Sequence, residues 1–320
     1  MAWKGITFFP PDANFPFIKL RDICVGLSFL AMLGSLVLFM TRGLNYGIDF
    51  KGGTLIEIGT KGPANLGELR DKLGSLGLGE VQIQGFGKPE DVLIRLETQA
   101  GGEAAQQAAV EKVRGALGDS VDYRRVEVVG PTVSSELRQT GIIAVSIAIL
   151  MIGAYIWFRF EWQFAVGAIV ALLHDALTTI GIFSLLQMEF DISVVAALLT
   201  IVGYSINDTV VVSDRIRENL RKYRKMPLAE LLNRSINETL SRTIITSGTT
   251  MIAIIALYFL GGEVIRGFNF AMMWGVFVGT YSSIFIAAPI LQYLGIKRDW
   301  SGTGGGEAKA KEPAGSKAKA

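Results

Sequence analysis

The sequence predicts an α-helical polytopic membrane protein with six transmembrane helices and a small α+β ferredoxin-like extracytoplasmic domain between the first two helices. Half of the 320 residues are hydrophobic, a share that soluble domains seldom reach. Six apolar segments are long enough to cross ~30 Å of hydrocarbon at ~1.5 Å per residue. The stretch between the first two segments alternates between strand-like and helix-like periodicity, which indicates a folded domain.

The apolar segments give the expected positions of the spans. We place them at residues 23–40, 141–158, 163–186, 192–213, 243–260 and 268–294. Lys19 and Arg21 precede the first segment, and no small-residue cleavage site follows it at signal-peptide distance. The first segment is therefore predicted to be a retained span, with a cleaved signal as the less favoured alternative.

Basic residues in the short connections predict the orientation of the chain. Residues 214–241 contain seven Lys and Arg residues, whereas the connection 187–191 has two acids and no base. We therefore expect the N-terminal residues 1–22, the basic loop 214–241 and the tail 295–320 to be cytoplasmic. The composition of the tail predicts disorder, and a solvated tail is favoured over one that contacts anionic lipid or an acidic partner.

The segment 45–139 has the order strand, helix, strand, strand, helix, strand. Residues 54–58, 92–96 and 126–128 read as strands, as does the alternation of Val81 and Ile83 with glutamines. Leucines at helical spacing from 66 to 76, and Val110, Val113 and Leu117, predict the two helices. This order is that of a ferredoxin-like domain. The segment contains no His, no Cys and no paired acid–base motif, so we expect a binding or lever role and no catalysis.

Two ionisable residues in the spans are the strongest candidates for function. Asp208 lies inside the fourth span and Arg242 opens the fifth. Such residues cost several kcal/mol at membrane depth and occur mainly where they line a pathway or pair with each other. If the two spans are antiparallel neighbours, the residues lie at similar depth, and an ion pair would keep the aspartate ionised until a proton competes. Arg242 alone could instead be a cytoplasmic anchor that snorkels.

Polar residues accompany both charges at helical spacing. Thr200, Tyr204 and Asn207 lie on the face of the fourth span that carries Asp208, and Thr246 and Thr249 follow Arg242 in the fifth. These two stripes could line a wet pathway. Polar residues of this kind also hold helices together by hydrogen bonds, which is the competing interpretation.

The third span contributes His174 and Asp175. His174 is the only histidine of the chain and could relay a proton, although a buried structural hydrogen bond is nearly as well supported. One cysteine excludes an intrachain disulfide, and no zinc-type spacing occurs. The net charge of +2 does not indicate a nucleic-acid partner. No phosphate-binding G-x-x-x-x-G-K-[ST] loop is present. We therefore expect no cofactor, with protons as the coupling ion, because one charge crossing 100 mV is worth ~2.3 kcal/mol.

Four groups of motifs carry a family resemblance. They are YGIDFKGGT at 46–54, FRFEW at 158–162 with HD at 174–175, GYSINDT at 203–209 with SDRIREN at 213–219, and RTIITSGTT at 242–250. In this order, and with six spans, the chain resembles the SecF family of accessory subunits of the bacterial Sec protein-export machinery. The resemblance runs from about residue 46 to residue 298.

The resemblance implies a function and partners. SecF-like proteins resemble half of an RND-type transporter, pair with SecD in the bacterial cytoplasmic (inner) membrane, and are surrounded by membrane lipids. The complex uses the proton-motive force to help preproteins through the SecYEG channel after the ATPase SecA has started them. A proton-coupled RND-type exporter of lipids or small molecules and a non-conducting structural subunit are the alternatives, and none of the three is an enzyme.

The resemblance also implies residue roles. By motif match, Asp208 and Arg242 are the residues that take part in proton transport in the family. The family's third charged residue belongs to SecD, so we expect an incomplete proton path in this chain alone. For Asp49, Gly52 and Gly53 we expect a structural role, with the glycines permitting a tight turn.

Overall fold

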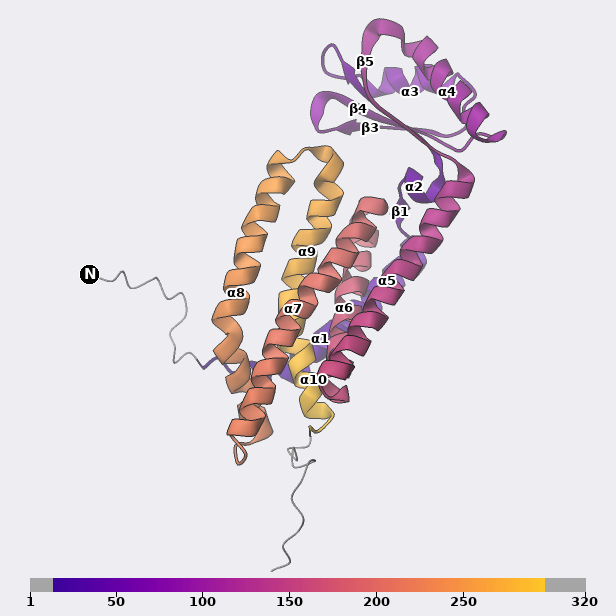
Figure 1. Cartoon of the computed structure of the whole chain (residues 1–320). Helices are drawn as coiled ribbons and strands as arrows, with labels where there is room; N and C mark the ends of the chain where they lie inside the picture. Colours follow the sequence, from indigo (N-terminus) through magenta and orange to yellow (C-terminus); the bar gives the residue numbers. More distant parts are fainter. Residues whose placement is uncertain (1–13, 297–320) are drawn as a thin grey trace, which may run out of the picture.

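The computed structural model describes residues 14–296 and shows a bundle of long helices with a small sheet domain at one end (Figure 1). Within these residues, six helical segments are long and apolar enough to cross a membrane: Phe17–Arg42, Pro131–Arg159, Trp162–Leu186, Ile192–Lys222, Leu228–Leu260 and Arg266–Tyr293. This confirms the predicted fold class. The predictions for residues 1–13 and for the tail beyond residue 296 lie outside the described residues.

The spans correspond to long helices, some of them interrupted. The first contains a 3₁₀ turn, η1 (Phe17–Leu20), and α1 (Arg21–Arg42). The next four are α5 (Pro131–Arg159), α6 (Trp162–Leu186), α7 (Ile192–Lys222) and α8 (Leu228–Leu260). A short 3₁₀ turn, η3 (Glu263–Ile265), precedes the last span, which comprises α9 (Arg266–Ser282), a π-helical turn η4 (Ser283–Ala287) and α10 (Ala288–Tyr293).

The basic segment 214–241, expected as a loop, is mostly helical. The helix α7 continues to Lys222 and α8 begins at Leu228, so only the short turn between them connects the two. Both extensions are amphipathic: Ile216 of α7 and Leu231 of α8 lie in one buried apolar cluster, while charged residues occupy the outer faces. Hydropathy detects only the uniformly apolar part of a helix, which is why the helices extend beyond the expected spans here and at the start of α5.

The sheet domain, which we call the external domain after its expected location, has the predicted order of elements. It comprises β2 (Gly53–Thr60), α3 (Leu66–Gly74), β3 (Val81–Phe86), β4 (Lys88–Leu96), α4 (Gly102–Leu117), a 3₁₀ turn η2 (Gly118–Ser120) and β5 (Val121–Val129). The strands form an antiparallel sheet in the order β3-β4-β2-β5, which is the ferredoxin-like arrangement. The helices α3 and α4 cover the sheet face turned away from the bundle (Figure 1). Ile56, Ile94 and Val113 are fully buried in the core between them.

Two short linkers lie between the domain and the bundle. The linker after α1 contains β1 (Asn45–Tyr46) and α2 (Ile48–Lys51), and the linker between α6 and α7 contains β6 (Glu189–Phe190). The strands β1 and β6 pair in parallel, so that the entrance to the external domain is tied to the start of α7.

Buried residues are concentrated in α6, α7 and α9, whereas α1, α5 and α8 expose apolar side chains. Glycines allow α7 and α9 to pack closely. A Cβ on Gly275 would lie 2.2 Å from a side-chain carbon of Ile201, and one on Gly279 would lie 3.1 Å from Cβ of Ser205. The polar residues discussed below lie in or beside this contact.

Candidate functional site

Asp208 lies between three helices in the middle of the bundle. Its side chain projects from α7 and the residue is only 3% exposed. Its Oδ2 accepts a hydrogen bond from Ser247 Oγ of α8 at 3.4 Å, and Ser247 Oγ in turn lies 2.7 Å from Thr280 Oγ1 of α9. The carboxylate therefore contacts one hydroxyl through a long hydrogen bond, and no ion pair to it is present within residues 14–296.

The expected direct ion pair between Asp208 and Arg242 is not formed. The guanidinium interacts electrostatically with the carboxylate, but the described contacts include no hydrogen bond or ion pair between them. The reason lies in the helix geometry. Arg242 precedes Ser247 by five residues, and at ~3.6 residues per turn the two side chains point about 140° apart around α8. Ser247 faces Asp208, so Arg242 lies on the exposed side.

The two polar stripes lie largely on the outer surface of the bundle. Thr200 and Asn207 are exposed on α7, and Tyr204 is half-buried with its hydroxyl 3.4 Å from Thr250 Oγ1 of α8. Thr246 and Thr249 donate hydrogen bonds to backbone carbonyls of their own helix. The stripes do not line an enclosed pathway within the described part of this chain. They form a polar surface on α7 and α8.

His174 and Asp175 form a second buried cluster. Asp175 Oδ1 lies 2.9 Å from His174 Nδ1. Its Oδ2 accepts hydrogen bonds from Ser205 Oγ of α7 at 2.6 Å and Ser282 Oγ of α9 at 2.8 Å. Asp175 is 0% exposed and is saturated by these partners. Its carboxylate joins three helices through short contacts, whereas the Asp208 carboxylate directly joins only α7 and α8.

The two carboxylates share the α7–α9 contact. Ser205, which binds Asp175, precedes Asp208 by one helical turn, and Thr280 near Asp208 precedes Ser282 by two residues. The π-helical turn begins directly after Ser282, and such turns are frequent at functional sites. Sequence reasoning missed the two serines, because hydroxyl residues are common in spans. The only signal was the position of Ser205 one turn from Asp208.

The glycine motif after α1 has a clear steric basis. Gly52 and Gly53 have φ angles of +74° and +120°, and a Cβ on Gly53 would lie 2.3 Å from the carbonyl oxygen of Leu96. Asp49 makes a contact that the sequence did not predict. Its Oδ2 accepts a hydrogen bond at 2.9 Å from the backbone N–H of Ile192, the first residue of α7. The motif therefore lies directly against the helix that carries Asp208.

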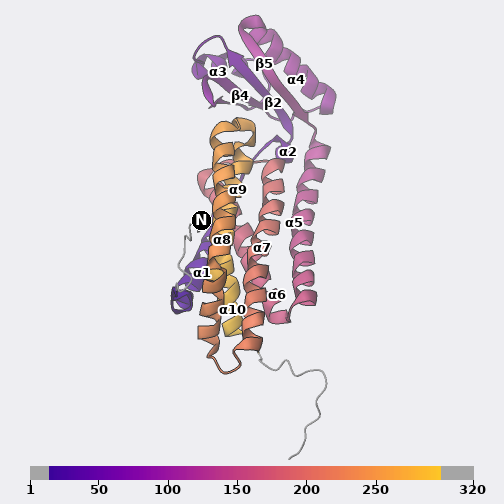
Figure 2. The same cartoon turned by 60° about the vertical axis from the view of Figure 1, so that its left-hand side comes forward.

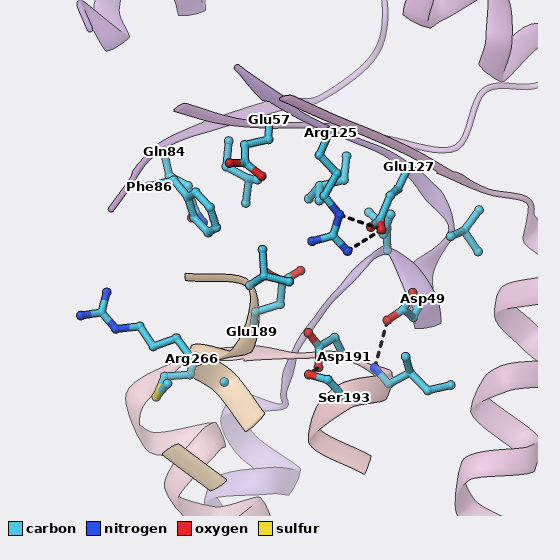
Figure 3. Close-up of a pocket in the computed structure, with 18 of the residues that line it drawn as sticks. Asp49, Glu57, Gln84, Phe86, Arg125, Glu127, Glu189, Asp191, Ser193 and Arg266 are labelled. Atoms are coloured by element: carbon cyan, nitrogen blue, oxygen red, sulfur yellow. Dashed lines mark hydrogen bonds and ion pairs between the residues drawn. The ribbon is translucent and has the colours of Figure 1, made fainter. Parts of the chain in front are cut away.

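A cavity of about 750 Å³ separates the uncovered sheet face from the ends of α7 and α9. Charged side chains line both walls (Figure 3). Glu57, Arg125 and Glu127 project from the sheet, with Arg125 paired to Glu127. Glu189 and Asp191 lie on the opposite wall.

Glu189 connects the two walls. Its carboxylate forms an ion pair with Arg95 of β4. Burial raises the pKa of Glu189, and Arg95 opposes this shift only in part. Across residues 14–296, no group of three or more His, Cys, Asp or Glu side chains is placed to hold a metal ion.

Comparison with known proteins gives the family. The family described as "Protein export membrane protein SecD/SecF, C-terminal" matches residues 109–297, and the "SecD/SecF GG Motif" matches residues 37–64. The second match contains Asp49, Gly52 and Gly53. Together the matched regions include the glycine motif, both buried carboxylates and Arg242.

Relatives that match over most of this chain indicate the same family. The chain is 47% identical over 314 residues to the protein translocase subunit SecF of Rhodobacter capsulatus, covering 93% of this chain and 94% of the relative. It is 45% identical over 285 residues to SecF of Vibrio alginolyticus, covering 88% and 90%. It is also 42% identical to the protein translocase subunit SecDF of Brucella abortus, covering 92% of this chain but 39% of that relative.

A solved structure shows the same fold. The crystal structure of SecDF, a translocon-associated membrane protein from Thermus thermophilus, superposes with a TM-score of 0.81 at 38% identity. The match covers 90% of this chain and 39% of that one. The chain therefore corresponds to about two fifths of each of these SecDF chains. The chain, a multi-pass membrane protein of a transport family, therefore belongs to the SecF family of protein translocase subunits.

Proposed function

We propose that this SecF-family chain works with SecD and uses the proton-motive force to promote the late steps of preprotein export through the SecYEG channel. The observation that carries this proposal is the environment of Asp208. The carboxylate is 3% exposed, has one hydroxyl partner at 3.4 Å, and has no direct cationic partner within the described residues. A buried carboxylate with so few partners gains from binding a proton, which favours a titrating role.

Protonation changes what Asp208 can do. An ionised carboxylate only accepts hydrogen bonds, whereas a protonated one also donates. Proton uptake therefore changes the contact with Ser247 and removes the attraction to Arg242. Both residues lie on α8, so each protonation state favours its own packing of α7 against α8. The external domain moves with these helices and biases a preprotein outward.

A SecD subunit completes the site. Arg242 and Asn207 are exposed at membrane depth, where an isolated charge is costly. A partner helix that brings a further charged residue to this surface would bury it and supply the missing part of the proton path. This chain covers only 39% of each matched SecDF chain. This supports an arrangement in which a SecD subunit lies beside it.

The solved structures support movement. A SecDF structure described as the super-membrane-facing form superposes on this chain with a TM-score of 0.65 at 39% identity. The other SecDF structure gives 0.81 at 38% identity. The two SecDF structures have nearly the same sequence identity to this chain but differ in their structural similarity to it. This difference supports more than one arrangement of the shared elements within the family.

The orientation follows from charge. The turn between α7 and α8 lies at the end of the bundle opposite the external domain (Figure 2). Arg215, Arg217, Arg221 and Lys222 lie near it. The excess of basic residues supports placing this end and both termini in the cytoplasm of a bacterial inner membrane.

The test uses vesicles that contain the SecD partner and SecYEG, with a preprotein already started by SecA and ATP. A proton gradient is imposed, and completion of export is compared for the parent and for Asp208→Asn. We expect the gradient to stimulate only the parent, while both variants assemble with SecD equally well. Equal stimulation of both would contradict proton coupling at Asp208 and would favour a structural subunit. Gradient-driven movement of lipids or small molecules, without an effect on export, would favour an exporter.

A further inference from the structure

The start of α7 is held by contacts that come from the external domain and its linker. The strands β1 and β6 pair at Asn45 with Glu189 and at Tyr46 with Phe190. Asp49 Oδ2 accepts a hydrogen bond from Ile192 N at 2.9 Å (Figure 3). These contacts join the two linkers, one leading into the external domain and the other into α7.

The ion pair between Glu189 and Arg95 extends this connection into the sheet. Arg95 belongs to the central strand β4, which pairs with β2 and β3. The side chains of Arg95 and Glu189 are only 12% and 31% exposed, so solvent screens the pair less than a surface ion pair. A Cβ on Gly47 would lie 2.9 Å from Glu189 Oε1, so the glycine leaves room for this carboxylate. The backbone at Gly47 therefore packs closely against the carboxylate of Glu189.

The helix α7 is a continuous rod between this connection and Asp208. Ile192 precedes Asp208 by sixteen residues, or ~24 Å along the helix axis. A tilt of α7 caused by repacking around Asp208 must therefore displace Ile192 and the linker before it. Whether the sheet follows depends on the contacts that hold that linker.

We propose that the Glu189–Arg95 ion pair, together with the contact from Asp49 to the first residue of α7, forms a positioning joint that transmits movement of α7 to the external domain. We call Glu189, Arg95 and Asp49 the α7 joint. The joint rests on the proposed function for the source of the movement, but its mechanical part is independent of protons.

Glu189→Gln separates the joint from the stability of the fold. Because burial raises the pKa of Glu189, the native state holds its proton more tightly than an unfolded chain does. The stability that this provides is present at low pH and is lost as pH rises from about 4.5 through the raised pKa. At neutral pH the negative charge of Glu189 therefore adds no net stability to the folded state, and a neutral glutamine of similar size should leave the fold intact. It removes the charge attraction to Arg95.

The first experiment measures the joint directly. The full chain with its SecD partner is placed in lipid nanodiscs, with Cys24→Ser and spin labels at Lys112→Cys on α4 and Leu260→Cys at the end of α8. Both labelled residues are exposed. We expect a narrow distribution of inter-label distances in the parent. Glu189→Gln and Arg95→Gln should broaden it, and the charge exchange Glu189→Arg with Arg95→Glu should narrow it again.

Asp91→Asn is the matched control. It removes an ion pair of 2.7 Å to Arg124 that lies within the external domain and does not reach the bundle. We expect no broadening in this variant. An unchanged distribution in Glu189→Gln and Arg95→Gln, or equal broadening in Asp91→Asn, would overturn the joint.

The second experiment measures gradient-driven completion of export in the vesicles. Mutations along a coupling route change coupling by about two- to thirtyfold, and we expect a loss in this range for Glu189→Gln with recovery in the charge exchange. Asp49→Ala should act in the same direction. If Asp208→Asn abolishes the gradient effect while Glu189→Gln and Asp49→Ala leave it unchanged, the proposed function stands and the joint fails. If Asp208→Asn is silent, the proposed function fails, and the distance measurement alone decides on the joint.

Discussion

Asp175 and Asp208 are both buried carboxylates at the contact of α7 with α9, yet their surroundings differ. Asp175 has short contacts to His174, Ser205 and Ser282, whereas Asp208 has one hydroxyl at 3.4 Å. A saturated carboxylate stabilises one arrangement of helices. A poorly satisfied carboxylate leaves two protonation states close in free energy. The comparison separates the residue that holds the bundle together from the residue that can move it.

The largest expected effect tests Asp175. Asp175→Ala leaves His174 and Ser205 without this acceptor in the bundle interior, while Ser282 keeps the carbonyl oxygen of Gly279 at 3.2 Å. Each buried polar group left unpaired costs about 1–3 kcal/mol, so we expect a loss of about 2–6 kcal/mol. We expect strongly reduced thermal stability of the complex in detergent. Asp208→Ala, with one long hydrogen bond to lose, should cost about 1 kcal/mol or less. Equal destabilisation of the two variants would remove the distinction.

The next prediction concerns the packing that places both carboxylates. Gly275→Val adds side-chain atoms where a Cβ already lies 2.2 Å from Ile201. Overpacking of this kind costs about 1–3 kcal/mol and would separate α7 from α9. The measurement is thermal unfolding together with assembly with SecD. Gly26→Val on the exposed surface of α1, where no atom lies within 4 Å of the added Cβ, is the matched control and should unfold like the parent.

A smaller effect is expected at the glycine motif. Gly53→Ala forces a Cβ to within 2.3 Å of a backbone carbonyl at a φ of +120°, which costs about 1–3 kcal/mol of backbone strain. Limited proteolysis of the external domain should accelerate. Gly115→Ala, within α4 and with open space around it, should instead protect the domain, because alanine favours a helix by about 0.5–1 kcal/mol. The same protease susceptibility in both variants would contradict the steric account.

The smallest change is at Ser247. Ser247→Ala removes the hydroxyl between Asp208 and Thr280, a net loss of about 0.5–1.5 kcal/mol. We expect near-normal stability but an altered dependence of export on the imposed gradient. Ser146→Ala on α5 is the control, since that exposed hydroxyl donates to the carbonyl of Ile142 in its own helix and lies away from Asp208. A gradient response altered equally by both changes would show that Ser247 has no special relation to Asp208.

The sequence was sufficient for the features that depend on local pattern. The ferredoxin-like order followed from alternation and helical spacing, and Asp208 was evident because a charge inside an apolar run is costly. Contacts between distant residues were not predictable. Asp49 and Ile192 are 143 residues apart. Serine is a common residue type in membrane spans, so Ser282 did not stand out in the sequence. The absence of the Asp208–Arg242 ion pair depends on which way Arg242 faces around α8 relative to Ser247, and residue depth alone did not predict it.

The most direct test of the central claim is infrared spectroscopy of the complex with SecD across a pH titration, because protonated carboxyl groups absorb separately from carboxylates. We predict that one pH-dependent carboxyl band, separate from the one that Glu189→Gln removes, disappears in Asp208→Asn and persists in Asp175→Asn, provided that each variant assembles. Persistence of the band in Asp208→Asn, or its loss only in Asp175→Asn, would contradict the assignment of Asp208 as the residue that gains and loses the proton.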